Sequence, residues 1–168
     1  MNAANASETV LILDFGSQFA QLIARRVREL GVFSLLVAPG TPLETIRKLG
    51  AKGIIMSGGP ASVFEEGAPR CDPGILDLGI PVLGICYGMQ LGCHMMGFEV
   101  SPAQHREYGR AQLNVRDGAG LMHGVPAHTT VWMSHGDQVK DAHGDLAVLA
   151  STDTCPVAAV AHRRKPFF

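Results

Sequence analysis

The sequence predicts a single α/β domain whose sheet is mostly parallel, open and flanked by helices. Three features favour this class. Short, almost wholly apolar runs alternate with segments in which apolar residues recur at helical spacing. The links between them are short and rich in glycine, which is typical of strands joined by helical crossovers. The chain has 168 residues, which suits one domain with a substantial core.

The first half of the chain carries this alternation. A strand that is covered on both faces is a short apolar run, and such runs occupy residues 9–14, 33–38, 53–57 and 82–85. Helices are predicted between and after them at residues 19–30, 43–49, 72–78 and 89–96. Gly31 and Gly50 follow two of these helices, where a C-terminal cap is expected. Asp72 precedes Pro73, which pairs a capping side chain with a proline at the first helical position.

The second half, after about Phe98, has a different pattern. Strands are predicted near residues 112–116, 129–133, 147–150 and 157–161, without strong helices between them. No internal repeat, low-complexity tract or linker divides the chain. We therefore expect one domain over residues 9–168. It follows a disordered lead over residues 1–8, which has neither the positive charge nor the apolar run of a signal peptide.

Composition argues against several classes of partner. The 14 basic and 15 acidic side chains give a formal net charge of -1, which argues against nucleic acid or an anionic membrane as partner. No apolar run approaches the length of a membrane span. The four cysteines are irregularly spaced and follow no export signal, so we expect reduced thiols in a cytoplasmic protein.

One cysteine lies in a motif that carries chemistry. Residues 84–88 read Gly-Ile-Cys-Tyr-Gly where a buried strand meets a helix, which is the cysteine form of the nucleophile elbow. Side chains at the two glycines would collide with the neighbouring strand and helix. The turn lifts the Cys86 sulfur out of the sheet, beside helix amides that favour a thiolate and can donate to an oxyanion. The pentapeptide alone is equally compatible with a buried structural cysteine.

A second glycine-rich loop strengthens the functional interpretation. Residues 57–60 read Ser-Gly-Gly-Pro and follow the neighbouring predicted strand. Ligands of open α/β sheets bind beyond the carboxyl ends of the strands, and glycines let backbone amides approach a ligand closely. Two such loops on adjacent strands predict an oxyanion site.

Together these motifs resemble those of the class I glutamine amidotransferases, whose fold is flavodoxin-like. Residues 82–90, Val-Leu-Gly-Ile-Cys-Tyr-Gly-Met-Gln, are similar to the nucleophile motif of the family, and residues 54–60 are similar to its oxyanion loop. Residues 12–18, 24–31 and 131–137 resemble the GMP synthetase branch. The resemblance covers residues 10–168 and implies that Cys86 forms a γ-glutamyl thioester and releases ammonia. The amides of Gly59 and Tyr87 would then form the oxyanion hole.

The resemblance also implies how the substrate and a partner are held. Gly58, Gln90 and Gly136 would bind L-glutamine, while His135 and Asp137 would couple this site to an ATP pyrophosphatase (synthetase) domain of the same enzyme. In this branch that domain uses Mg-ATP to aminate xanthosine monophosphate to GMP. The parent enzyme, of which this chain would be one domain, would then be a ligase of purine biosynthesis. We expect no cofactor or metal in the domain itself, and a homodimeric parent. The chain contains no usual nucleotide-binding loop.

The sequence departs from the family pattern near its end. The family takes its base and orienting carboxylate from a His-Pro-Glu motif in a late strand and loop, and this motif does not occur in the 168 residues. The chain ends at Lys165-Pro166-Phe167-Phe168, where that strand would begin. We therefore expect a C-terminally truncated domain that is inactive alone, because a thiol nucleophile needs a base. Of the seven histidines, His135 is the best placed to replace it.

Other functions remain compatible with these residues. The chain could be the glutaminase of another class I amidotransferase, although residues 134–137 favour the GMP synthetase branch. It could also be a glutamine-binding module that never completes the reaction. Cys93 and His94 could suggest a metal site with Cys86, but no ligand pair at the usual zinc spacing accompanies them.

Overall fold

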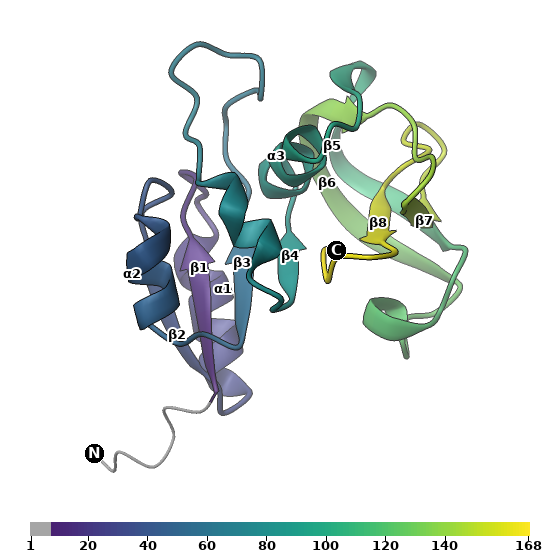
Figure 1. Cartoon of the computed structure of the whole chain (residues 1–168). Helices are drawn as coiled ribbons and strands as arrows, with labels where there is room; N and C mark the ends of the chain where they lie inside the picture. The colour runs from purple at the N-terminus through teal and green to yellow at the C-terminus, as the bar shows by residue number, and fades with distance from the viewer. Residues whose placement is uncertain (1–7) are drawn as a thin grey trace.

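The computed structural model describes residues 8–168, and their side chains except those of residues 104–107 and 135. Apart from Glu8, the predicted lead therefore lies outside the described residues. A four-stranded parallel sheet and a four-stranded antiparallel sheet make up the fold, and helix α3 (Tyr87–Met95) lies between them (Figure 1). None of the described helices is long and apolar enough to cross a membrane.

The parallel sheet confirms the fold predicted for the first half of the chain. Its strand order is β2-β1-β3-β4, and every neighbouring pair is parallel. The strands are β1 (Thr9–Leu13), β2 (Phe33–Val37), β3 (Gly53–Met56) and β4 (Val82–Gly84). Leu11, Ile12 and Leu13 are fully buried, as expected for a central strand covered on both faces.

Helices α1 (Ala20–Glu29) and α2 (Leu43–Lys48) cover opposite faces of this sheet (Figure 1). The reason is that the β1-to-β2 and β2-to-β3 crossovers run in opposite directions, and right-handed crossovers then place their helices on opposite faces. The predicted helix at 72–78 is instead a short 3₁₀ helix, η2 (Pro73–Asp77). Its cap is as predicted, since the Asp72 carboxylate accepts a hydrogen bond from the Gly74 N–H at 2.8 Å.

The second half forms a sheet of its own, with strand order β6-β5-β7-β8 and antiparallel neighbours. The strands are β5 (Val100–Val115), β6 (His128–Val139), β7 (Leu146–Ser151) and β8 (Ala159–His162), and a 3₁₀ turn, η3 (Gly120–Met122), separates β5 from β6. The four predicted strands are present, but β5 and β6 are much longer than predicted. Buried residues of both sheets, among them Met56, Val139 and Val160, share one hydrophobic core with Leu91 of α3.

Residues 166–168 lie beside β4, at the point where the sequence predicts the beginning of a further strand. The Val82 N–H donates to the Pro166 carbonyl at 2.7 Å, and the Gly84 N–H donates to the Phe168 carbonyl at 2.8 Å. Phe167 forms a parallel bridge with Val82 and is buried. The segment therefore pairs as a parallel strand would, directly beside the strand that leads to Cys86.

Candidate active site

Cys86 lies in the tight turn between β4 and α3. Its φ is 49° and its ψ is -111°, and among the described residues it is the one non-glycine residue with a positive φ. Such a conformation costs on the order of 1–3 kcal/mol and persists only where the surrounding structure enforces it. The structure therefore contains the strained turn that the sequence predicts for a nucleophile elbow.

The two glycines of the elbow have no room for a side chain. A Cβ atom on Gly84 would lie 2.5 Å from the Cα atom of Met89, in the first turn of α3. A Cβ atom on Gly88 would lie 2.2 Å from the carbonyl oxygen of Met56, at the end of β3. Both contacts are with backbone atoms, which cannot rotate away. The steric reason predicted for these glycines is confirmed.

The glycine-rich loop after β3 lies against the elbow. An added Cβ atom on Gly58 would be 3.6 Å from the Cβ atom of Cys86, and one on Gly59 would be 2.4 Å from the carbonyl oxygen of Phe15. The buried Ser57 hydroxyl fixes the loop, because it accepts from the Phe15 N–H at 2.9 Å and donates to the Gly58 carbonyl at 2.8 Å. The loop and Cys86 are thus held as one unit at the carboxyl ends of β3 and β4.

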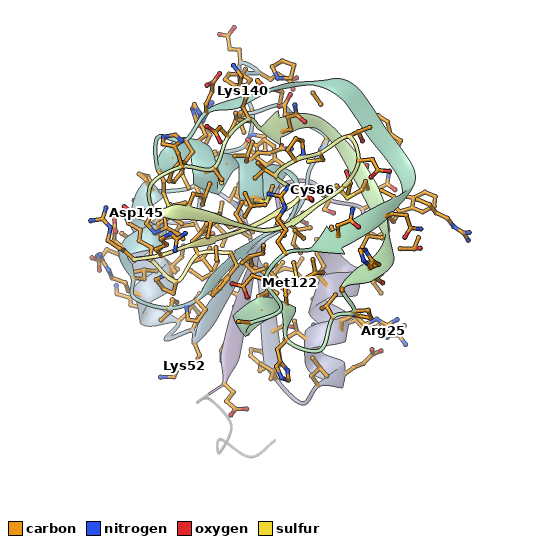
Figure 2. All side chains as sticks on the ribbon, turned by 90° about the vertical axis from the view of Figure 1, so that its right-hand side faces the viewer. Arg25, Lys52, Cys86, Met122, Lys140 and Asp145 are labelled. Carbon is orange, nitrogen blue, oxygen red and sulfur yellow. The ribbon has the colours of Figure 1, made fainter. Side chains whose placement is uncertain are left out.

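Cys86 lines two cavities. The larger has a volume of about 550 Å³, within the range of small-molecule sites. Its wall includes the predicted site residues Gly59, Tyr87, Gln90, Gly136 and Asp137, whereas Gly58 does not line it. The smaller cavity, of about 200 Å³, lies between the elbow, β6 and the loop that precedes β8. Figure 2 shows Cys86 near the middle of the molecule in that view, with Arg25, Lys52 and Lys140 at its periphery.

Gln90, which lines both cavities, links α3 to β6. Its side-chain amide donates from Nε2 to the backbone carbonyl of Asp137 at 2.7 Å, and both residues are buried. Asp137 lines both cavities, so this predicted coupling residue lies in the cavity wall and not on the outer surface. The side chain of His135, the other predicted coupling residue, lies outside the described part of the structure.

Burial raises the pKa of the Cys86 thiol. This differs from the expectation that helix amides favour the thiolate. Among the described residues that line the two cavities, none is a histidine, lysine or arginine that would favour the ionised sulfur. Burial also raises the pKa of Cys71 and of Cys93 to about 12. Cys86 is the least buried of the four cysteines. Its raised pKa means that the thiol, and not the thiolate, predominates at neutral pH.

Several residues of the site were not singled out from the sequence. Glu65, Tyr108 and Ser134 line the larger cavity, and Cys155 lines the smaller one. Ser134 lies in residues 131–137, which resemble a motif of the family and could have pointed to it. Glu65 and Tyr108 come from distant segments that contain no such motif. Among the described side chains, no group of three or more His, Cys, Asp or Glu residues is arranged to hold a metal ion.

Comparison with known proteins gives a consistent result. Residues 11–168 match the family model of the class I glutamine amidotransferases. The chain is 51% identical over 161 residues to a glutamine-hydrolyzing GMP synthase of Geobacillus kaustophilus, an alignment that covers 96% of this chain and 32% of that protein. It is 50% identical to the corresponding enzyme of Enterococcus faecalis, of which it covers 31%. The chain thus spans about a third of the length of these curated relatives.

Solved structures resemble the whole chain. A protein of Thermoplasma acidophilum, described as one of the subunits of a GMP synthase, has a TM-score of 0.84 and 30% identity. That comparison covers 96% of this chain and 81% of the other. A glutamine amidotransferase from Thermotoga maritima has a TM-score of 0.71 at 20% identity, covering 94% of this chain and 75% of that one, and shares the fold.

Proposed function

The chain belongs to the class I glutamine amidotransferase family, and on this premise we propose that it hydrolyses glutamine at Cys86 as the ammonia-producing part of a GMP synthase. The observation that carries the proposal is the strained Cys86, which is held between β4 and α3 in the wall of a cavity of about 550 Å³. The similarity to GMP synthases over 96% of the chain supports the choice of branch.

The reaction proceeds through a covalent intermediate. The Cys86 sulfur attacks the side-chain amide carbon of glutamine, and the tetrahedral intermediate expels ammonia to leave a γ-glutamyl thioester. Water then attacks the thioester, releases glutamate and restores the thiol. The cavity that Cys86 shares with Gln90 and Gly136 receives the substrate.

The backbone amides of Gly59 and Tyr87 stabilise the oxyanion. Both residues line the substrate cavity beside Cys86, and Tyr87 begins α3, whose first N–H groups have no acceptor within the helix. Loss of one such donor typically costs roughly 3–4 kcal/mol of transition-state stabilisation. The loop geometry enforced at Gly59 therefore matters almost as much as the thiol.

A base must take the thiol proton and deliver it to the departing ammonia. The raised pKa of Cys86 increases this need, since little thiolate is present at neutral pH without a base. The family resemblance assigns the role to a histidine of a His-Pro-Glu motif outside the 168 residues. Residues 166–168, paired beside β4, point to the edge of the sheet at which a strand carrying that motif would lie.

The ammonia is used by an ATP pyrophosphatase (synthetase) part of the parent enzyme, which aminates xanthosine monophosphate with Mg-ATP in a cytoplasmic, homodimeric protein. His135 and Asp137 couple the two sites. The position of Asp137 supports this role. Asp137 lines both cavities and its carbonyl is hydrogen-bonded to Gln90, so a shift of β6 would change the shape of the cavities around Cys86.

The test is GMP formation by the parent enzyme with amide-labelled glutamine or with ammonia. Cys86→Ala should abolish glutamine-dependent formation and leave ammonia-dependent formation unchanged. Cys155→Ala is the matched control, because Cys155 lines the smaller cavity without having a catalytic role. Label transfer by the Cys86→Ala variant would overturn the assignment. Glutamine binding without glutamate release by the intact parent would instead indicate a binding module.

A further inference from the structure

We propose that the outer face of the β5–β6 ribbon is the surface on which the ATP-dependent synthetase part docks, an inference that rests on the proposed function. This face consists of six exposed residues: Tyr108, Arg110, Gln112, Thr130, Trp132 and Ser134. Their exposure, their chemistry and their continuity with the substrate cavity carry the inference.

Strand register places the six side chains on one face. Tyr108 lies opposite Ser134, Arg110 opposite Trp132, and Gln112 opposite Thr130. Residues at alternate positions of a strand share a face, and all six are exposed while the intervening residues are half-buried or buried. The Gln112 amide donates to the Thr130 hydroxyl at 3.0 Å, which directly joins one of these cross-strand pairs.

This face has the composition of an interface. Trp132 is 72% exposed and Tyr108 is 66% exposed, and Trp132 is the single tryptophan of the sequence. An antiparallel ribbon that faces only water normally presents polar side chains on that side. Tyrosine, tryptophan and arginine are the residue types that dominate binding energies at protein interfaces. The face contains one cation and no carboxylate, so it fits a partner surface with an apolar recess beside an acidic group.

The face continues into the substrate cavity. Tyr108 and Ser134 belong to the outer face and also line the cavity that contains Cys86. A domain docked on the ribbon would therefore cover the cavity where ammonia is released and keep the ammonia from water. This position favours the consumer of the ammonia as the occupant over a second copy of the chain.

The length of the relatives supplies the candidate partner. The chain accounts for 32% and 31% of the two GMP synthases to which it is similar, so about two thirds of each lies outside the matched region. Contacts between domains of one protein typically bury roughly 600–1,500 Å². The six residues would form the centre of such a contact.

The experiment uses two variants of the parent enzyme, Trp132→Ala and Arg110→Glu, each made separately and called the ribbon variants. Phe33→Ala is the matched control, because Phe33 is 55% exposed on the edge strand β2 of the other sheet. Both ribbon variants should lower glutamine-dependent GMP formation at least about tenfold, a loss expected when interface anchors are truncated. They should also release more than one glutamate per GMP and leave ammonia-dependent formation unchanged. The control should change none of these.

A photo-cross-linker at position 112 identifies the occupant. A link to the synthetase part supports the proposal, and a link to a second copy of this domain overturns it. Ribbon variants that lose activity equally with glutamine and with ammonia also overturn the docking proposal, and so do variants that lose no activity with either donor. In both cases the proposed function stands. A parent enzyme that forms no GMP from either donor overturns the proposed function and, with it, this one.

Discussion

At the residue scale, two opposed influences act on the Cys86 sulfur. The start of α3 stabilises a negative charge by about 0.3–1 kcal/mol, and by up to about 2 kcal/mol in a partly buried geometry. Burial acts in the other direction and raises the pKa of the thiol. We expect burial to dominate, because no cation among the described residues lines the cavities. The strained turn thus positions the sulfur, and under the proposed function its activation requires a base.

Labelling tests this balance. Cys86 should be the one cysteine alkylated stoichiometrically by 6-diazo-5-oxo-norleucine, because Cys71, Cys93 and Cys155 are buried. The thiolate is the reacting form. Below the pKa the fraction of thiolate grows about tenfold per pH unit, and the raised pKa of Cys86 extends this range to higher pH. Labelling of the 168-residue chain should therefore accelerate from pH 7 to pH 9 without a plateau. Peptide mapping that places the adduct elsewhere, or a plateau below pH 8, would contradict this.

A substitution at Gly88 tests the packing of the elbow. Alanine in a helix is usually favoured over glycine by about 1 kcal/mol. At Gly88 the sign should reverse, because the new Cβ would lie 2.2 Å from the Met56 carbonyl oxygen. We expect Gly88→Ala to lower the free energy of unfolding by roughly 1–3 kcal/mol. Gly40→Ala is the control, since nothing lies within 4 Å of its Cβ position. Equal denaturant midpoints for the two variants would rule out the clash.

At the element scale, the quality of the sequence predictions follows from how each element is buried. Strand β1, Thr9–Leu13, is predicted to within one residue because apolar side chains fill both of its covered faces. Strand β5 spans Val100–Val115, but the sequence predicts only its last part, because polar residues interrupt the alternation in its first ten positions. Helix α3 begins at Tyr87, two residues earlier than predicted, because the elbow leads directly into the helix and Cys86 itself is the N-cap residue.

The connection between α3 and β6 could not be predicted from local pattern. It includes a hydrogen bond between residues 47 positions apart, from Gln90 Nε2 to the Asp137 carbonyl. Gln90→Met keeps the side-chain volume but removes the donor, and losing a buried hydrogen bond typically costs about 1–3 kcal/mol. We expect a lower Tm and, in the parent enzyme, a higher KM for glutamine. Thr41→Val, which removes an exposed hydrogen bond to the Ala38 carbonyl in the loop after β2, should change neither. An unaltered KM in Gln90→Met would exclude this link from the substrate site.

At the scale of the whole molecule, the candidate site lies where the two sheets meet. The glycine-rich loops after β3 and β4 provide one wall, and the sequence predicts this wall because both loops carry recognisable motifs at the ends of apolar strands. Gly136 and Asp137 of β6 provide the other wall. Those residues were assigned through the family resemblance alone, because nothing in their local sequence shows that a second sheet packs against α3.

The same arrangement leads to a prediction for the 168 residues alone, which should have no appreciable glutaminase activity. None of the described residues that line either cavity is a histidine, and burial keeps the Cys86 thiol protonated at neutral pH. In serine triads, loss of one member leaves only about 10³–10⁴-fold catalysis over water, from binding and the oxyanion hole. A similar residual rate would be hard to detect above background.

The measurement is glutamate release by the 168 residues and by a version extended through a His-Pro-Glu motif, each compared with its own Cys86→Ala variant. The extended version should release glutamate in a Cys86-dependent manner, whereas the short one should match its variant. Equal Cys86-dependent rates would mean that one of the seven histidines of the sequence serves as the base. The described histidines do not line the cavities, so attention would turn to His105 and His135, whose side chains lie outside the described part of the structure. Replacing each with alanine in the short chain would then identify the base.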